Sequence, residues 1–146
     1  MNKKELRKIL IDKINKAYWW HVTPVDPDAY KKRGKFLASS YSRAEFYGRP
    51  NMEPERVNIL NPVFGYSEKE ILKYLFPEKY KDLMLKAHDD YQDDWYEKRI
   101  GLDSKMYKQA KKAGFDAIVL VDSTGRKSLE QNRKPRSIEL NLLNVC

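Results

Sequence analysis

The stretch 115-FDAIVLV-121 is the clearest β-strand in the sequence, since residues 117–121 are all apolar and include β-branched side chains. Just before it, the spacing predicts a helix through 106-MYKQAKKA-113. Asp103 or Ser104 is expected to cap this helix at its start, and Gly114 to end it. A helix followed at once by a strand indicates a mixed α and β domain.

The segment that follows this strand is polar. Residues 122–136, DSTGRKSLEQNRKPR, predict a long connection, which inside a small domain is usually functional or mobile. The next stretch, 138-IELNLL-143, alternates apolar with polar side chains and predicts the final strand.

The first part of the chain opens with an amphipathic pattern. Residues 2–17 carry apolar side chains at helical spacing and predict a helix packed on the body of the protein. The aromatic stretch 18-YWWHV-22 predicts a short strand that ends before Pro24. Residues 25–34 have the composition of a turn that closes on Gly34.

Two further strand and helix pairs follow. Residues 36–40 predict a strand that runs into a short helix, with Ser42 and Glu45 as a capping box and Gly48 as its end. Residues 57–64 predict a strand interrupted by Pro62. A helix over 67–76 and one or two charged helices over 78–99 come next.

Length and composition are typical of one globular domain. The chain has 146 residues, enough for a single core, and we expect one domain over 1–146 in which the charged helices at about 67–100 are an insertion. No stretch approaches the roughly 20 apolar residues that span a bilayer, and the N-terminus lacks the core of a signal peptide. A cytoplasmic location, or action in a host cytoplasm, is expected. The single cysteine, Cys146, predicts neither a disulfide nor a thiolate metal site.

The net charge indicates the kind of partner. A formal charge of +8 favours an anionic partner such as a nucleic acid, an acidic protein or a phosphate-bearing substrate. The lysines and arginines are spread along the chain without a long run, so solubility alone also explains the charge.

Several chemistries are disfavoured by what the sequence lacks. There is no G-x-S-x-G serine, no G-x-G-x-x-G or Walker loop, and only two histidines. The acidic stretch 88-HDDYQDDW-95 offers carboxylates at helical spacing, but no second cluster completes a coordination shell, so a solvated acidic face is the better interpretation and no metal is expected.

One set of residues supports a more specific hypothesis. The stretch 34-GKFLASSYSRAEFYG-48 resembles the NAD-binding segment of the ADP-ribosyltransferases, in the branch of diphtheria toxin and the poly(ADP-ribose) polymerases. That pattern has a glycine, an aromatic residue, a small residue, a serine and a tyrosine. The matching residues here are Gly34, Phe36, Ala38, Ser42 and Tyr47.

Both ends of the chain extend this resemblance. The branch begins with an aromatic strand that ends in a histidine, as 19-WWHVT-23 does. It ends with a glutamate that opens a strand, and Glu139 in 139-ELNLLN-144 fits that form. Two departures are Val22, where many relatives have glycine, and Phe36, where tyrosine is common. Val22 still offers its backbone N–H and C=O, and Phe36 keeps a stacking face.

The resemblance implies an α+β fold with the split β-sheet core and flanking helices of the ADP-ribosyltransferases. It further implies NAD as a substrate, with no metal, and with Glu139 and His21 as the catalytic residues. Breaking the bond between nicotinamide and ribose builds positive charge on the ribose, which a carboxylate stabilises. The residues that would bind NAD are His21, Val22, Thr23, Gly34, Phe36, Ala38, Ser42 and Tyr47.

Within that site, Phe36 and Tyr47 would stack on the nicotinamide and Ser42 would bond its carboxamide. His21 would orient a ribose hydroxyl of the adenosine half as a neutral imidazole. Phe36 and Tyr47 as ordinary core residues, and Ser42 as a helix cap, remain simpler interpretations of the same positions.

The expected function is a small mono-ADP-ribosyltransferase that moves ADP-ribose from NAD to a macromolecular acceptor, protein or nucleic acid. Its size suits a toxin, an effector or a phage protein that modifies its host. Ser137, two residues before Glu139, disfavours arginine as the acceptor. Two alternatives stay open: a nucleic-acid-modifying or RNA 2′-phosphotransferase-like member, for which the sequence shows no arginine and histidine cluster, and a non-catalytic domain that binds nucleotide or a partner.

Overall fold

The computed structural model describes residues 2–87 and 95–145, and their strands form one five-stranded sheet in the order β1-β2-β5-β4-β3. Only β3 and β4 pair in parallel, and the other neighbours are antiparallel. An α+β fold is thus confirmed. The sheet is continuous rather than split, because β5 pairs with both β2 and β4. The strands are β1 (Trp20–His21), β2 (Lys35–Ala38), β3 (Pro62–Gly65), β4 (Ala117–Val121) and β5 (Ile138–Leu142).

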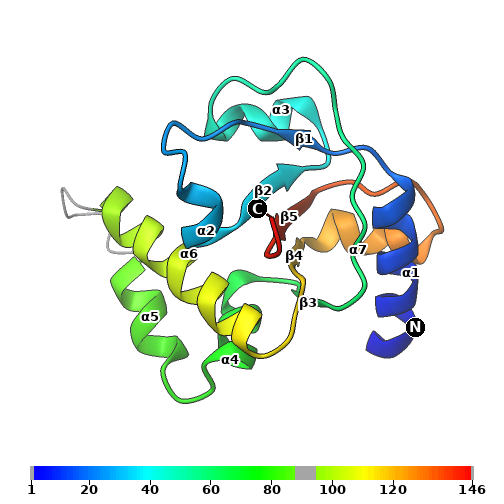
Figure 1. The fold of residues 1–146 in the computed structure, drawn as a ribbon. Coiled ribbons are helices and arrows are strands. Elements are labelled where there is room, and N and C mark those ends of the chain that lie inside the picture. Colours follow the sequence, from blue (N-terminus) through cyan, green and yellow to red (C-terminus); the bar gives the residue numbers. More distant parts are fainter. Residues whose placement is uncertain (1, 88–94, 146) are drawn as a thin grey trace.

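Helices cover both faces of this sheet (Figure 1). One face packs against α1 (Lys3–Lys16) and α7 (Ser123–Glu130). The opposite face packs against α4 (Glu68–Leu75), α5 (Tyr80–Ala87) and α6 (Trp95–Lys112). Two shorter helices, α2 (Ala29–Arg33) and α3 (Tyr41–Ala44), flank β2, and η1 (Glu45–Tyr47) follows α3. Among the described residues, no helix combines the length and the apolar character needed to cross a bilayer.

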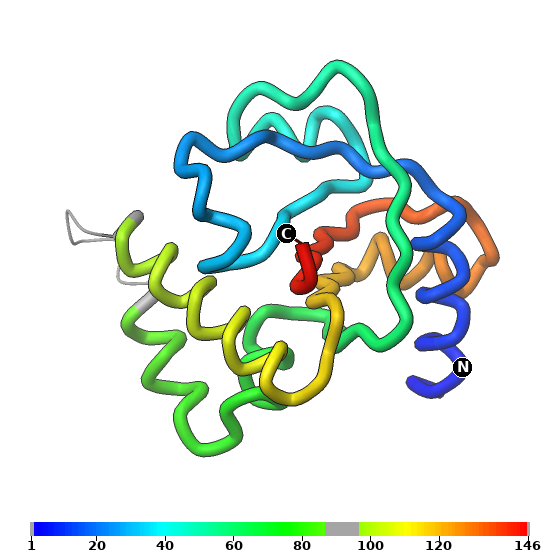
Figure 2. The backbone as a smooth tube through the Cα atoms, in the orientation of Figure 1, coloured from blue at the N-terminus to red at the C-terminus, as the bar shows by residue number. Residues whose placement is uncertain are grey.

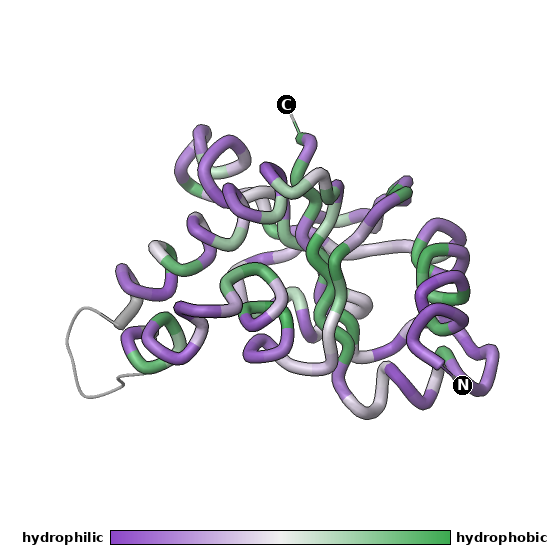
Figure 3. The backbone as a smooth tube through the Cα atoms, turned by 90° about the horizontal axis from the view of Figure 1, so that it is seen from below, coloured by the Kyte–Doolittle hydropathy of each residue, from purple (hydrophilic) through white to green (hydrophobic). Residues whose placement is uncertain are grey.

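The alternation predicted for the last strand sorts its side chains between the two faces. Ile138 and Leu140 are buried in the cluster under α1 and α7. Glu139 and Asn141 point to the opposite face, where they line a small cavity next to α4 and α6. Figure 3 shows the apolar strands at the centre of the molecule, with more hydrophilic helices around them. The period of two in the sequence therefore directs the Glu139 carboxylate to the face of the sheet that α4 and α6 cover.

The N-terminal helix confirms its prediction closely. Leu6, Leu10 and Ile14 recur every fourth residue and are buried on the sheet. Asn2 precedes the helix, and its side chain accepts a hydrogen bond from the backbone N–H of Glu5 at 2.8 Å. The helix predicted from residue 67 is also confirmed, with Ser67 as the cap of α4.

Three predictions in the first half of the chain are wrong. The turn expected over 25–34 contains the helix α2, which ends at Gly34. The cap of α3 is Ser40 instead of Ser42, since the backbone at Ser40 is extended and its hydroxyl accepts from the N–H of Arg43 at 3.3 Å. The strand expected over 57–64 begins only at Pro62, the residue that was expected to interrupt it. Figure 2 follows the long connection from η1 to β3 that takes its place.

Two predictions in the second half are also wrong. Helix α6 runs through Gly101 and Asp103 without a break, because the Asp103 carboxylate binds Arg99 one turn earlier instead of capping a new helix. The polar connection over 122–136 contains α7, whose start is capped by Asp122. Strands β4 and β5 are confirmed. The assignment of about 67–100 as an insertion stays a prediction.

Gly34 is required by packing as well as by backbone conformation. Its φ is +84°, and a Cβ at this position would lie 2.1 Å from the side-chain oxygen of Asn141 and 2.7 Å from the carbonyl oxygen of Leu142. The Asn141 side chain is held there because its amide donates to the carbonyl of Arg33 at 2.9 Å. The junction of α2 with β2 is therefore fixed by β5.

This close approach predicts a large loss of stability for Gly34→Ala. Gly114→Ala serves as the matched control, because Gly114 also has positive φ, +92°, but has open space around it. The control should lose roughly 1–2 kcal/mol through backbone strain alone. Gly34→Ala should lose roughly 1–3 kcal/mol more through overpacking. Equal losses in urea unfolding of the two variants would contradict the packing argument.

Candidate functional site

His21 is buried at the edge of the sheet and hydrogen-bonded through both ring nitrogens. It is 4 % exposed. Its Nδ1 lies 2.7 Å from the carbonyl oxygen of Phe36, and its Nε2 lies 2.8 Å from the hydroxyl of Tyr30 on α2. The aromatic strand predicted to deliver His21 to the interior thus does so. Tyr30, however, lay in the segment predicted as a turn.

These two contacts determine the tautomer of His21. A carbonyl oxygen can only accept, so Nδ1 must carry the proton, and Nε2 of the neutral ring then accepts from the Tyr30 hydroxyl. Burial lowers the pKa of His21, and the bond to the Phe36 carbonyl partly opposes this. His21 is therefore a neutral imidazole whose acceptor nitrogen is already occupied by a phenol.

A cavity of about 660 Å³ opens beside His21. This volume is within the range of pockets that hold small molecules and cofactors. Most of the residues predicted to bind NAD line it: His21, Val22, Thr23, Gly34, Phe36, Ala38 and Tyr47. The structure therefore brings together residues from β1, β2 and η1 that are up to 26 positions apart in the sequence.

Ser42 is the predicted NAD-binding residue that does not line this cavity. It is exposed on α3, and its hydroxyl lies 3.3 Å from the hydroxyl of Ser40. The glycine, aromatic and small positions of the pattern are in place, whereas the serine points elsewhere.

The rings of Phe36 and Tyr47 stack on each other in the lining of the cavity. Their centroids are 6.2 Å apart and their planes are inclined by 25°. A ring inserted between them would need about 7 Å, which is two contacts of about 3.5 Å. Tyr47 is 52 % exposed and follows a short 3-10 turn, so it is the less constrained of the two rings.

Glu139 lies next to this pair of rings. Its register partners are Ala38 on β2 and Leu120 on β4. Burial raises the pKa of the Tyr47 hydroxyl, and the charge of Glu139 raises it further, which places the carboxylate close to that hydroxyl. Glu139 lines a second, smaller cavity of about 60 Å³, and Phe36 lines both cavities.

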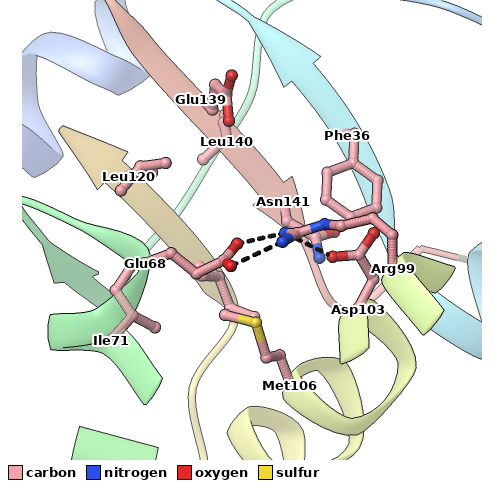
Figure 4. A pocket seen from close by; sticks show the side chains of 11 residues that line it. Phe36, Glu68, Ile71, Arg99, Asp103, Met106, Leu120, Glu139, Leu140 and Asn141 are labelled. Carbon is pink, nitrogen blue, oxygen red and sulfur yellow. Dashed lines mark hydrogen bonds and ion pairs between the residues drawn. The ribbon is translucent and has the colours of Figure 1, made fainter. Parts of the chain in front are cut away.

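An ion cluster that sequence reasoning missed forms the floor of the smaller cavity (Figure 4). Arg99 donates to both oxygens of Glu68, at 2.6 Å for the longer bond, and to Asp103 at 3.1 Å. Burial raises the pKa of Asp103 to about 6, opposed by Arg99 and reinforced by the charge of Glu68. Glu68 and Asp103 thus share one guanidinium, and Glu139 lines the same cavity.

Only part of this ion cluster could have been found from the sequence. Arg99 and Asp103 have the i, i+4 spacing of an ion pair on a helix, which predicts their contact. Glu68 is 31 residues away from Arg99, so no local spacing predicts that contact. The segment 88–94 proposed and set aside as a metal site lies outside the described residues. Elsewhere in the described chain, no group of three potential metal ligands is found.

Comparison with known proteins gives no match: neither a family profile nor a curated protein nor a solved structure is similar to this chain. The site must therefore be interpreted from its own geometry.

The tautomer of His21 can be tested by NMR. Long-range ¹H–¹⁵N correlation spectra should show the Nδ1–H form, and the ring should still be neutral at pH 6.5, because burial lowers its pKa below that value. His88→Gln assigns the signals, since the chain has only two histidines. An Nε2–H tautomer, or half protonation at pH 6.5 or above, would show that the geometry derived for His21 is wrong.

The raised pKa of Asp103 predicts a pH-dependent contribution to stability. Between its unfolded pKa of about 3.9 and its folded pKa of about 6, the folded chain binds the proton more tightly, so this contribution is lost as pH rises. The free energy of unfolding relative to Asp103→Asn should fall by at most roughly 3 kcal/mol from pH 4 to pH 7. A difference between the wild type and Asp103→Asn that stays constant over this pH range would refute the assignment.

Proposed function

We propose that this protein is a NAD-dependent mono-ADP-ribosyltransferase, which cleaves the bond between nicotinamide and ribose and transfers ADP-ribose to a macromolecular acceptor. The observation that supports it most is the convergence of His21, Phe36, Tyr47 and Glu139. The first three line one cavity of cofactor size, and Glu139 lies beside the ring pair. These residues come from three strands and a 3-10 turn, so no single sequence motif explains why they lie close together in space.

Glu139 stabilises the transition state in this proposal. The breaking glycosidic bond leaves positive charge on the ribose, and a carboxylate held beside it interacts more strongly with that state than with the neutral ribose of NAD. The strand pairing on both sides fixes the backbone of Glu139, which keeps the carboxylate in position without reorganisation.

The nicotinamide ring binds between Phe36 and Tyr47. Because the present separation of 6.2 Å is short of the roughly 7 Å needed, Tyr47 moves outward by about 1 Å when the ring enters. Gly48 has a φ of +135° and ends the 3-10 turn of Tyr47, so this side of the wall has the freer backbone.

The adenosine half binds at the opposite part of the cavity, near β1 and α2. Since Nε2 of His21 accepts from Tyr30, the ligand hydroxyl bonds to the Tyr30 oxygen instead of the imidazole. His21 thus acts as a positioning residue: it holds the Tyr30 hydroxyl, which contacts the ligand in its place.

The acceptor approaches from the side of the smaller cavity, which is lined by Glu139 together with the ion cluster of Glu68, Arg99 and Asp103. This wall carries more carboxyl groups than guanidinium groups, and a carboxyl group there can accept the proton that the acceptor loses. The target is a protein side chain or a nucleic acid. A toxin, an effector or a phage protein that modifies its host is the setting proposed for this activity, inside a cytoplasm.

A second candidate function gains from one observation. The arginine and histidine grouping that a nucleic-acid-modifying, RNA 2′-phosphotransferase-like protein requires is absent from any short stretch of sequence, but Arg33 and Arg49 line the same cavity as His21. RNA oligonucleotide binding that weakens steeply between 50 and 200 mM salt would favour this alternative, as expected for multiple phosphate contacts.

The role of Glu139 is tested by nicotinamide release from NAD. Glu139→Gln should lower kcat by about 10²- to 10³-fold with little change in KM, because the amide keeps the shape and removes the charge. Glu130→Gln is the matched control, since Glu130 is exposed on α7, where it pairs with Arg126. Release that Glu139→Gln leaves unchanged would refute this role, and no release from the wild-type protein, with or without cell extract, would refute the function.

A further inference from the structure

We propose that Arg33 and Arg49 form a subsite for the diphosphate of a nucleotide, within the cavity that His21, Phe36 and Tyr47 also line. The inference rests on the proposed function for the identity of the ligand, whereas the place of the subsite comes from the cavity itself. It assigns a role to two residues that belong to none of the motifs in the sequence.

Both guanidinium groups are free to bind a ligand. Within residues 2–87 and 95–145, Arg43, Arg99 and Arg126 form ion pairs with carboxylates. Neither Arg33 nor Arg49 has a hydrogen bond or an ion pair from its side chain to a described residue. Each arginine therefore keeps its five N–H donors for a ligand in the cavity.

The cavity wall has a positive balance of charge. Asp26 is the acidic side chain among its lining residues. Its carboxylate accepts from the N–H of Asp28 at 2.9 Å and from Lys32 at 3.0 Å, and these two bonds lower its pKa. The charge of Arg33 also acts on Asp26 and on Asp103. With two arginines against one aspartate, the lining of the cavity still favours an anion.

The backbone at both arginines is anchored. The carbonyl of Arg33 accepts from the buried amide of Asn141. Two residues after Arg49, the N–H of Asn51 donates to the carbonyl of His21 at 2.8 Å, which ties this segment to β1. Two donors on separate, anchored segments are suited to bridge two linked phosphates, and guanidinium binds phosphate in a bidentate manner.

A nucleoside diphosphate fits this wall better than a nucleic acid backbone does. The space is a cavity of about 660 Å³ with aromatic rings in its lining, the size of a single small ligand. Binding to a nucleic acid backbone uses a basic groove that tracks many phosphates. Arg33 lies on α2 three residues after Tyr30, and Arg49 lines the same cavity, so the phosphates would sit next to the proposed adenosine position.

Calorimetric titration with ADP and with adenosine tests the subsite. Wild-type protein should bind ADP at least tenfold more tightly than adenosine, and more weakly as salt is raised. Arg33→Gln and Arg49→Gln should each weaken ADP binding about tenfold or more, because each removes charge-assisted hydrogen bonds. Both variants should bind adenosine as the wild type does, which also shows that they are folded.

The matched control is Lys31→Gln, which removes the same charge from α2 at an exposed position outside the cavity. The subsite is refuted if ADP binds no more tightly than adenosine, if Lys31→Gln weakens ADP as much as the arginine variants do, or if those variants weaken both ligands equally. ADP binding as predicted, in a protein that releases no nicotinamide from NAD, would retain the subsite and refute the transferase activity.

Discussion

The pairing of β5 between β2 and β4 is the constraint on which the rest of the structure depends. Alternate side chains of β5 enter opposite faces of the sheet, so that Ile138 and Leu140 join the cluster under α1 and α7 while Glu139 and Asn141 line the smaller cavity on the other face. The same register places Glu139 opposite Ala38 and Asn141 opposite Phe36. A shift of one residue would bury Glu139 among the leucines under α1 and α7, so the fold and the candidate site depend on the same register.

The site is assembled through backbone groups as much as through side chains. The carbonyl of Phe36 fixes the proton of His21, and the Asn141 amide holds the carbonyl of Arg33. Each link joins β2 or its neighbouring segment to a different part of the chain. The cavity is therefore largely pre-formed, apart from the narrow separation of the rings of Phe36 and Tyr47.

Sequence reasoning predicted the elements whose signals are local. The helical spacing in α1, the apolar run of β4 and the alternation in β5 were sufficient. The cavity-lining positions Phe36 and Tyr47 followed from the resemblance of residues 34–48. It failed where the deciding contact is distant. Aspartate is a common helix cap, but in the structure Asp103 binds Arg99 instead. Arg99 is in turn held by Glu68 from another helix. Likewise, no local pattern in the sequence predicts the hydrogen bond between Tyr30 and His21.

Phe36 is a wall common to both cavities. In the proposed reaction it separates the compartment of the donor nucleotide from that of the acceptor, so its ring also controls how water reaches the ribose. A smaller side chain would join the two spaces and give water the same route as the acceptor. The partition of the reaction between hydrolysis and transfer would then depend on the bulk of one aromatic ring.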